Sequence, residues 1–195
     1  MMDLSVIIPV YNSEKTIRPA ILSLFNSDFD KKFEIIVVND GSTDKSIEQI
    51  KDLNVKILQQ ENKGAAAARN KGAKHAKSDL LLFVDADVVY LKDTIRRIYE
   101  LLKRDGVGYV TVRYSKKPLN NKWIHKYKAL ADYCYSYDFI FTKEQRKNPL
   151  KQVVLAGGTE GYKKNIFWEM GGFDEQIKGA SVEQEKLIAK IAKKY

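Results

Sequence analysis

Two aspartates, Asp85 and Asp87, follow a short apolar run and are the first residues in this sequence that could do chemistry. The run reads LLLFV from Leu80 to Val84 and predicts a buried strand, where an unpaired carboxylate would be unfavourable. Acids spaced i and i+2 on an extended chain point to the same face. Such a pair can hold Mg²⁺, which commonly takes one or two carboxylates together with phosphate oxygens and water. A turn with two solvated acids explains the same residues, because a bare Asp-x-Asp is common by chance.

Two more polar clusters follow predicted strands. One comprises residues 9–12, PVYN, with Glu14, and the other comprises residues 39–44, NDGSTD. A helix-capping turn accounts for residues 41–44, since Asp-Gly favours turns and Ser and Thr favour helix N-caps. It accounts less well for Asp40, because a carboxylate at a strand end can accept a hydrogen bond from a nucleotide base or a ribose.

A helix with small residues is predicted over residues 64–77, and it carries Arg69 and Asn70 one turn in. The sequence contains neither Gly-x-x-x-x-Gly-Lys-Ser/Thr nor Gly-x-Gly-x-x-Gly, so the two common phosphate-binding loops are excluded. Arg69 can meet a base, a phosphate or an acid. A structural salt bridge is an equally good explanation for it.

These clusters need a scaffold that brings them to one place, and the apolar pattern predicts one. Short apolar runs alternate with helical stretches, which indicates an α/β fold with a mostly parallel sheet covered by helices on both faces. The carboxyl ends of the strands then share one edge, where ligands usually bind. The expected strands are 4–10, 33–40, 55–60, 79–87 and 106–114, and the expected helices are 13–27, 43–53, 64–77 and 93–104.

The region after residue 115 is less regular. Residues 122–141 carry an apolar stripe at helical spacing, which is typical of a core helix, although the aromatic residues and lysines also suit a helix at a membrane interface. Residues 142–149 are polar and predict an exposed loop. Without repeats or a low-complexity linker, 195 residues predict a single domain.

The composition is that of a globular protein, with 44% hydrophobic and 30% charged residues. A single cysteine, Cys134, excludes an internal disulfide and suits a reducing compartment. No segment reaches the length of a membrane span, so we expect a cytoplasmic protein, with contact to the inner face of the membrane left open. The net charge of +9 favours an anionic partner, and a solvated, lysine-rich surface explains it equally well.

The clusters, taken in order and spacing, resemble the family-two glycosyltransferases of GT-A fold. The resemblance extends from about residue 4 to residue 187 and rests on SVIIPVYNSEKTI, EIIVVNDGSTDKS, ENKGAAAARNKGAKHAKSDLLLFVDADVV and FWEMGGFDE. It implies a Rossmann-like fold, with a nucleotide-binding half at 1–90 and an acceptor half at 91–195. It also implies inverting transfer of a sugar from a UDP- or GDP-linked donor, with Mg²⁺ or Mn²⁺, to a glycan or lipid-linked acceptor.

The resemblance also assigns roles to individual residues. Asp85 would approach the ribose or the metal, and Asp87 would bind the metal directly. Tyr11 would lie against the base, and Asp40 would hydrogen-bond to the base. The remaining positions expected to line the nucleotide-sugar pocket are Pro9, Glu14, Gly64, Arg69 and Ala86.

One position departs from the family pattern. The family places its catalytic base, an aspartate, shortly after GGFDE, and this sequence has Gln184 there, between Glu183 and Glu185. An amide cannot act as a general base. Either neighbouring glutamate supplies the base, the register is shifted by one, or the site is altered. An acidic first turn that interacts favourably with the helix dipole also explains the two glutamates.

Two other classes remain to be compared with the enzyme. A non-catalytic nucleotide-sugar-binding domain is favoured by Gln184 and by the end of the chain soon after the expected catalytic helix. The same early end leads us to expect a soluble fragment of a longer enzyme, with membrane attachment of that enzyme left open. A nucleic-acid-binding module would use the basic charge but leaves Asp85 and Asp87 unexplained, so we expect no nucleic-acid partner.

Overall fold

The computed structural model describes residues 1–111, 159–177 and 182–194. The stripe expected over 122–141 and the loop expected over 142–149 lie outside the described residues, as does the end of the strand expected over 106–114.

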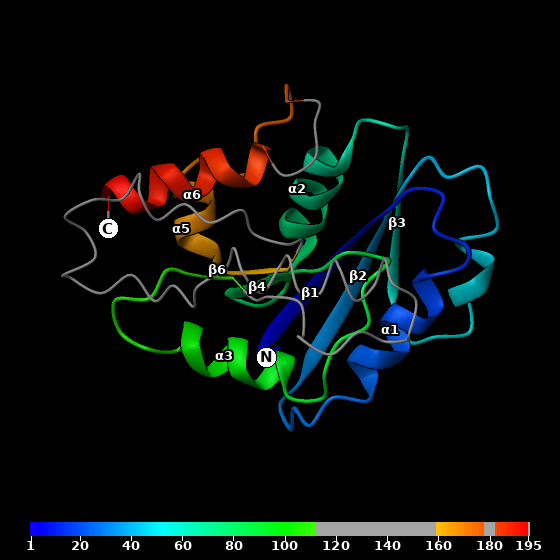
Figure 1. The fold of residues 1–195 in the computed structure, drawn as a ribbon, viewed down its shortest axis with the longest axis horizontal. Helices are drawn as coiled ribbons and strands as arrows, with labels where there is room; N and C mark the ends of the chain where they lie inside the picture. Colours follow the sequence, from blue (N-terminus) through cyan, green and yellow to red (C-terminus); the bar gives the residue numbers. More distant parts are fainter. Residues whose placement is uncertain (112–158, 178–181, 195) are drawn as a thin grey trace, which may run out of the picture.

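Six strands form one sheet in the order β3-β2-β1-β4-β6-β5 (Figure 1). Strands β3, β2, β1 and β4 are parallel, and β6 runs antiparallel to both of its neighbours, β4 and β5. The prediction of a mostly parallel sheet is therefore confirmed. The strands are β1 (Leu4–Val10), β2 (Phe33–Asp40), β3 (Lys56–Gln60), β4 (Leu80–Phe83), β5 (Tyr109–Thr111) and β6 (Glu160–Lys163).

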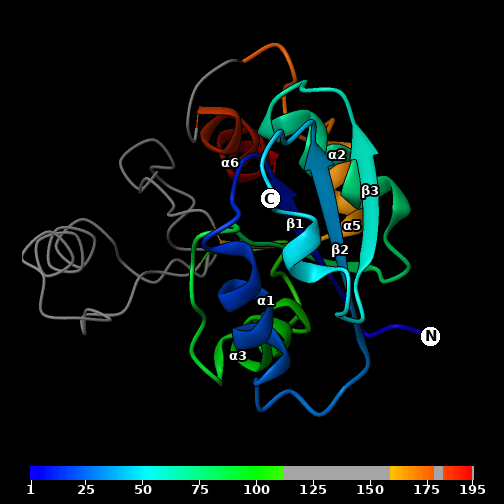
Figure 2. The same cartoon turned by 90° about the vertical axis from the view of Figure 1, so that its right-hand side faces the viewer.

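Helices cover both faces of the sheet, as predicted (Figure 2). One apolar core joins α1 and α3 to the sheet, and a second core joins α2, α5 and α6 to the opposite face. Strand β1 contributes to both, because Val6 and Ile8 face the first core while Ile7 faces the second. The helices are α1 (Ile17–Phe25), α2 (Ala65–His75), α3 (Thr94–Leu102), α5 (Lys164–Glu169) and α6 (Val182–Lys194), with a short 3₁₀ turn, η1 (Glu48–Ile50).

Helix α2 packs directly against the sheet through an inward face that is built mostly from alanine and glycine. A Cβ atom on Gly72 would lie 2.3 Å from Cγ2 of Ile7 on β1, so no larger residue fits there without movement. The small residues therefore bring the α2 backbone, and with it Arg69 and Asn70, against the centre of the sheet.

Two expected elements are shorter than the sequence suggested. The helix expected over 43–53 is reduced to η1. The carboxylate of Asp44 accepts hydrogen bonds from the backbone N–H and hydroxyl of Ser46 and from the backbone N–H of Glu14, and such local bonds compete with a helix. The strand expected over 79–87 ends at Phe83, so both acids of the Asp-Ala-Asp stretch lie in the loop that follows it.

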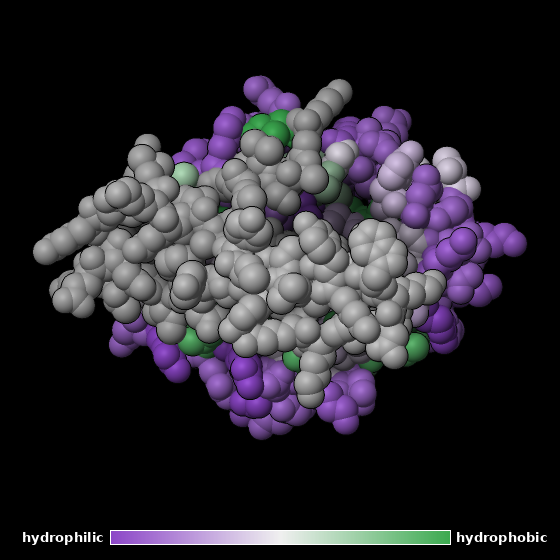
Figure 3. Space-filling view, viewed as in Figure 1, coloured by the Kyte–Doolittle hydropathy of each residue, from purple (hydrophilic) through white to green (hydrophobic). Residues whose placement is uncertain are grey.

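Where described residues show at the face in Figure 3, they are mostly hydrophilic. Within 1–111, 159–177 and 182–194, no helix is both long enough and apolar enough to span a bilayer.

Candidate functional site

The loop after β4 presents its two acids differently. The N–H of Val84 donates to the carbonyl of Ile7 at 3.0 Å, which continues the sheet pairing for one residue beyond β4. After that point Asp85 is half-buried, Ala86 is buried and Asp87 is exposed. The loop therefore turns one carboxylate toward the protein and the other toward solvent at the carboxyl edge of the sheet.

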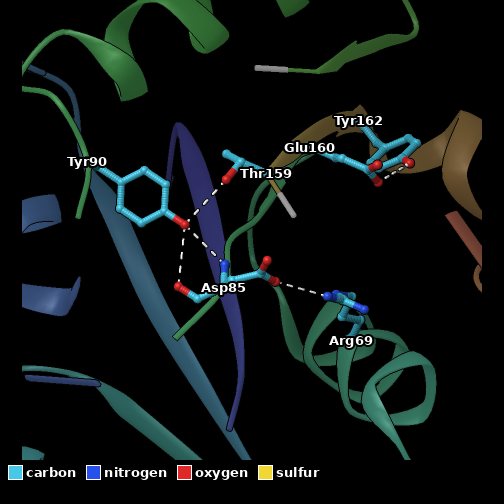
Figure 4. Close-up of polar contacts among 6 residues, drawn as sticks. All are labelled: Arg69, Asp85, Tyr90, Thr159, Glu160 and Tyr162. Carbon is cyan, nitrogen blue, oxygen red and sulfur yellow. Dashed lines mark hydrogen bonds and ion pairs between the residues drawn. The ribbon is translucent and has the colours of Figure 1, made fainter. Parts of the chain in front are cut away.

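Asp85 pairs with the arginine expected at the nucleotide site. A guanidinium nitrogen of Arg69 donates to Oδ1 of Asp85 at 3.0 Å (Figure 4), and the Arg69 side chain is only 8% exposed. The guanidinium also lies over the ring of Phe173, 5.8 Å from its centre. Arg69 is therefore buried against Asp85, and its expected place in the lining of the nucleotide-sugar pocket stays a prediction.

Asp40 is buried and its carboxylate already accepts three hydrogen bonds. Oδ1 accepts from the side chain of Gln60 at 2.7 Å and from the N–H of Lys63 at 2.8 Å, and Oδ2 accepts from the N–H of Gly64 at 2.9 Å. The acid therefore caps the loop entering α2, where Gly64 has a φ of 92°. A carboxylate offers about four acceptor positions, so these three bonds use most of its capacity.

The polar clusters at residues 9–12 and 39–44 are joined to each other by hydrogen bonds. The N–H of Asn12 donates to the hydroxyl of Ser42 at 3.1 Å, and Oδ1 of Asn12 accepts from the N–H of Thr43 at 2.9 Å. Asn12 adopts a positive φ of 50°, a conformation that asparagine tolerates better than most residues. These bonds join the loop after β1 to the loop after β2, and the two joined loops are called the rim below.

Three of the residues predicted to line the pocket, Tyr11, Pro9 and Glu14, lie at or next to this rim. Tyr11 is 52% exposed, which leaves its ring open to a partner. Pro9 is half-buried near the end of β1. Glu14 is half-buried, and its carboxylate accepts from the N–H of Lys45 at 3.5 Å, so part of it serves the rim itself.

Asn70, the residue after Arg69, holds the turn that precedes Phe173. The Asn70 side chain donates to the carbonyl of Phe173 at 2.8 Å and accepts from the N–H of Phe173 at 3.0 Å, across 103 residues of sequence. It also donates to the Glu175 carboxylate at 2.8 Å. The turn it holds needs glycine, because Gly171 and Gly172 have φ values of 91° and 66°. The sequence placed Asn70 correctly on the helix but assigned it no role.

Helix α6 begins at Val182 and carries the departure from the family pattern in its first turn. The side chain of Gln184 is 2% exposed, and its amide nitrogen has no hydrogen-bond partner within the described part of the chain. The side chains of Glu183 and Glu185 lie outside the described residues. Gln184 therefore occupies a buried position in the helix that was expected to supply the base.

Two further polar contacts near Asp85 were not anticipated from the sequence. The hydroxyl of Tyr90 accepts from the N–H of Asp85 at 3.0 Å and lies 3.3 Å from the hydroxyl of Thr159, just before β6. No motif or periodicity singles out Tyr90, so no sequence signal could have found it.

On β6, the Tyr162 hydroxyl donates to the fully buried carboxylate of Glu160 at 2.6 Å (Figure 4). Burial raises the pKa of Tyr162 well above its ordinary value, and the negative charge of Glu160 raises it further. Tyr162 therefore stays a neutral hydrogen-bond donor to this buried carboxylate over the physiological pH range.

The donor set at the end of β4 suits a cation that is also held by a diphosphate. Within the described residues, no cluster of three or more His, Cys, Asp and Glu side chains could hold a metal ion. Mg²⁺ retains water and needs only one or two carboxylates when phosphate oxygens are present, and oxygen ligands also suit Mn²⁺. Exposed Asp87 and half-buried Asp85 can supply these one or two carboxylates. The two carboxylates alone would not complete the coordination of the cation, which also needs the phosphate oxygens and water.

Comparison with known proteins identifies related sequences. Residues 5–171 match the sequence model described as Glycosyl transferase family 2. The chain is 30% identical over 194 residues to the minor teichoic acid biosynthesis protein GgaA of Bacillus subtilis, an alignment that covers 89% of this chain and 42% of GgaA. The chain therefore spans less than half the length of this relative.

Solved structures show the same architecture. Staphylococcus aureus TarS 1–349 in complex with UDP-GlcNAc superposes with a TM-score of 0.72 at 26% identity, over 98% of this chain and 54% of that one. The mannosyltransferase PcManGT of Pyrobaculum calidifontis, in complex with GDP-Man and Mn²⁺, superposes with a TM-score of 0.66 at 22% identity, over 94% of this chain and 50% of that one.

Proposed function

The chain belongs to glycosyl transferase family 2, and from that membership we propose that it transfers a sugar from a nucleoside-diphosphate donor to a hydroxyl acceptor, with inversion at the sugar. The donor is a UDP- or GDP-sugar, and the acceptor is a glycan or a lipid-linked carrier. Residues 1–90 build the donor side, and residues 91–195 contribute the acceptor side, with peripheral contact to a membrane surface. A UDP-sugar is the first choice to test, because TarS, of the same architecture, binds UDP-GlcNAc.

One observation carries the proposal: a buried arginine fixes Asp85 while Asp87 next to it remains exposed at the carboxyl edge of the sheet. A turn with two solvated acids does not need a buried arginine beside it, because burying a charge is unfavourable unless that charge is paired. The guanidinium of Arg69, 8% exposed, is paired with Asp85. The neighbouring rim offers the exposed ring of Tyr11 for a base, and the carboxylate of Asp40, although mostly occupied, is the acceptor expected for an N–H of that base.

We assign Mg²⁺ or Mn²⁺ to Asp85 and Asp87. When bound, the cation would offset negative charge on the departing nucleoside diphosphate. Asp87 contributes an exposed carboxylate to that site, and the hydrogen bond from Arg69 holds the Asp85 side chain in place beside it. A carboxylate near the start of α6, from Glu183 or Glu185, removes the proton of the acceptor hydroxyl.

The test is a screen of nucleotide sugars for thermal stabilisation of the protein, with and without Mn²⁺. At least one UDP- or GDP-sugar should raise the melting temperature more strongly with Mn²⁺ than without it, since a ligand that binds only the folded state stabilises it. If no nucleotide sugar raises the melting temperature under either condition, the donor site is wrongly assigned.

A second candidate function follows from Gln184, whose buried amide replaces the expected base. In that case the chain binds a nucleotide sugar without transferring it. Calorimetry with UDP and Mn²⁺, followed by a donor-hydrolysis assay, separates the two functions. Binding accompanied by turnover supports the transferase, and binding without turnover supports the binding domain.

A further inference from the structure

Tyr90 reaches back across its own loop to the residue that begins the Asp-Ala-Asp stretch. Its hydroxyl accepts a hydrogen bond from the N–H of Asp85 at 3.0 Å and lies 3.4 Å from the carbonyl oxygen of the same residue (Figure 4). The hydroxyl has one proton, which it can donate to that carbonyl or to the hydroxyl of Thr159 at 3.3 Å. One phenol therefore contacts both backbone polar groups of Asp85.

The backbone of Tyr90 is anchored as well. Its N–H donates at 2.9 Å to the hydroxyl of Ser23 on α1, and that hydroxyl donates at 2.6 Å to the carbonyl of Ala20. The Tyr90 side chain is 8% exposed, so the ring is held inside the protein. The loop from residue 85 to residue 90 is thus closed by one side chain that is fixed at both ends.

The closed loop explains how Asp87 is displayed. Ala86 is buried and Val88 packs partly against the core, so the residues on either side of Asp87 turn inward while Asp87 stays exposed. The aspartate is thereby held at the tip of a short loop whose base is closed at Asp85.

Thr159 extends this connection to the acceptor half. It is 4% exposed and immediately precedes β6, which pairs with β4 from Phe83↔Glu160 onward. The Tyr90 hydroxyl therefore joins the loop after β4 to the start of the strand that leads, through α5, to the Gly171–Gly172 turn.

We propose that Tyr90 is a positioning residue of the donor site, whose hydroxyl holds the Asp85–Asp87 loop in the geometry that binds the cation and the nucleoside diphosphate. This inference rests on the proposed function. It adds a residue that touches neither the metal nor the nucleotide and acts through the backbone of Asp85.

The test compares Tyr90→Phe with Tyr99→Phe. Tyr99 packs edge-on against Phe29 at 5.1 Å, and its hydroxyl makes no hydrogen bond to any residue that the structure describes. The first readout needs no ligand: hydrogen exchange at the Asp85 amide, followed by NMR, should be faster in Tyr90→Phe and unchanged in Tyr99→Phe. The second is calorimetry of UDP with and without Mn²⁺, at a temperature below the measured melting transition of every protein compared.

We expect Tyr90→Phe to weaken Mn²⁺-dependent UDP binding about three- to tenfold, the ratio that corresponds to losing one hydrogen bond. Binding of UDP without Mn²⁺ should not change, because the rim around Tyr11 and Asp40 is untouched. A purely structural role would lower both affinities together or neither. Thr159→Val should act in the same direction, and Thr159→Ser, which keeps the hydroxyl, should restore the wild-type affinity.

Equal Mn²⁺-dependent affinity in Tyr90→Phe and wild type would overturn the inference and leave the proposed function standing. If wild type itself does not bind UDP with Mn²⁺, the proposed function fails, and the positioning role fails with it. The titration of wild type therefore tests the proposed function, and the comparison of Tyr90→Phe with wild type tests the positioning role.

Discussion

The Arg69 guanidinium donates to the Asp85 carboxylate at 3.0 Å, with the arginine side chain 8% exposed and the aspartate 26% exposed. The pair joins the middle of the chain's small-residue helix to the loop after β4. Because the arginine is nearly excluded from water and the acid is not, the pair differs from the exposed ion pairs elsewhere on the molecule.

We expect Arg69→Met to lower the free energy of unfolding by about 1–3 kcal/mol. The value is below that for removing one member of a fully buried pair, since Asp85 keeps some contact with water. Urea denaturation measures the change. The control is Arg97→Met, which removes an ion pair with Asp93 whose arginine is 69% exposed and which should cost less than about 0.5 kcal/mol. Equal losses in the two variants would contradict the role given to Arg69.

We expect Asp87→Ala to weaken Mn²⁺-dependent UDP binding at least about tenfold while leaving the melting temperature unchanged, because its side chain is exposed. Calorimetry and a thermal melt test the two halves of the prediction. The matched control is Asp30→Ala, at another exposed aspartate, whose one ion pair within residues 1–111, 159–177 and 182–194 is with the neighbouring Lys31. Unchanged UDP affinity in Asp87→Ala would refute its assignment to the metal.

We expect one of the variants Glu183→Gln and Glu185→Gln to lower kcat about 10²- to 10⁴-fold, the usual contribution of a general base, without changing UDP affinity. Single-turnover transfer assays measure this. Gln184→Leu should keep wild-type kcat, because a neutral amide cannot remove a proton. If both glutamate variants remain fully active, neither residue is the base.

We expect Asn70→Ala to lower the free energy of unfolding by about 2–4 kcal/mol, since it leaves the buried N–H and carbonyl of Phe173 without their partner. Asn70→Asp keeps an acceptor for the N–H but repels Glu175, so it should also be destabilising. Urea denaturation is the measurement, and Asn165→Ala, at an exposed site on α5, should change stability by less than about 0.5 kcal/mol. A small effect at Asn70 would mean that the turn is held by other contacts.

Stability should depend on pH through Asp52. Hydrogen bonds from Arg18, at 2.7 and 2.9 Å, lower the pKa of the Asp52 carboxyl from 3.8 to about 2. A carboxyl whose pKa is lowered by folding stabilises the protein above its unfolded pKa, and that contribution disappears as pH falls through the folded value. The stability difference between wild type and Asp52→Asn should therefore be constant above pH about 5 and shrink between pH 3.8 and about 2. Urea denaturation across this range measures it, and a pH-independent difference would contradict it.

The strands that the sequence predicted well are those with an uninterrupted apolar pattern. Strands β1 and β2 have the expected bounds, because β-branched residues buried on both faces leave little alternative. The turn η1 was predicted as a longer helix, since apolar spacing does not reveal that Asp44 binds Ser46 and Glu14 instead. Strand β6 was missed because it is short and contains Gly161, and its pairing partner β4 lies far away in sequence.

The candidate site shows the same division. Asp40, Asp85 and Asp87 stand at or just after apolar runs in the sequence, and this was enough to place them near strand ends, where the structure has them. The hydrogen bonds that occupy Asp40, and the burial that hides Arg69, depend on side chains that converge only after folding. Local patterns do not encode such contacts, so the assigned roles of these residues in binding stay predictions.

The insertion of β6 between β4 and β5 has a consequence for synthesis on the ribosome. Strands β1 to β4 can pair as soon as they emerge, but the outer edge of β4 has no strand beside it until residues 160–163 are made. Strand β5 emerges earlier than β6, and among the strands that the structure describes it pairs with β6 alone, so its pairing must wait for β6. During that interval an apolar strand edge is open to pairing with other chains. We therefore expect nascent chains that stop before β6 to aggregate or to recruit chaperones, and those that extend past it to become soluble.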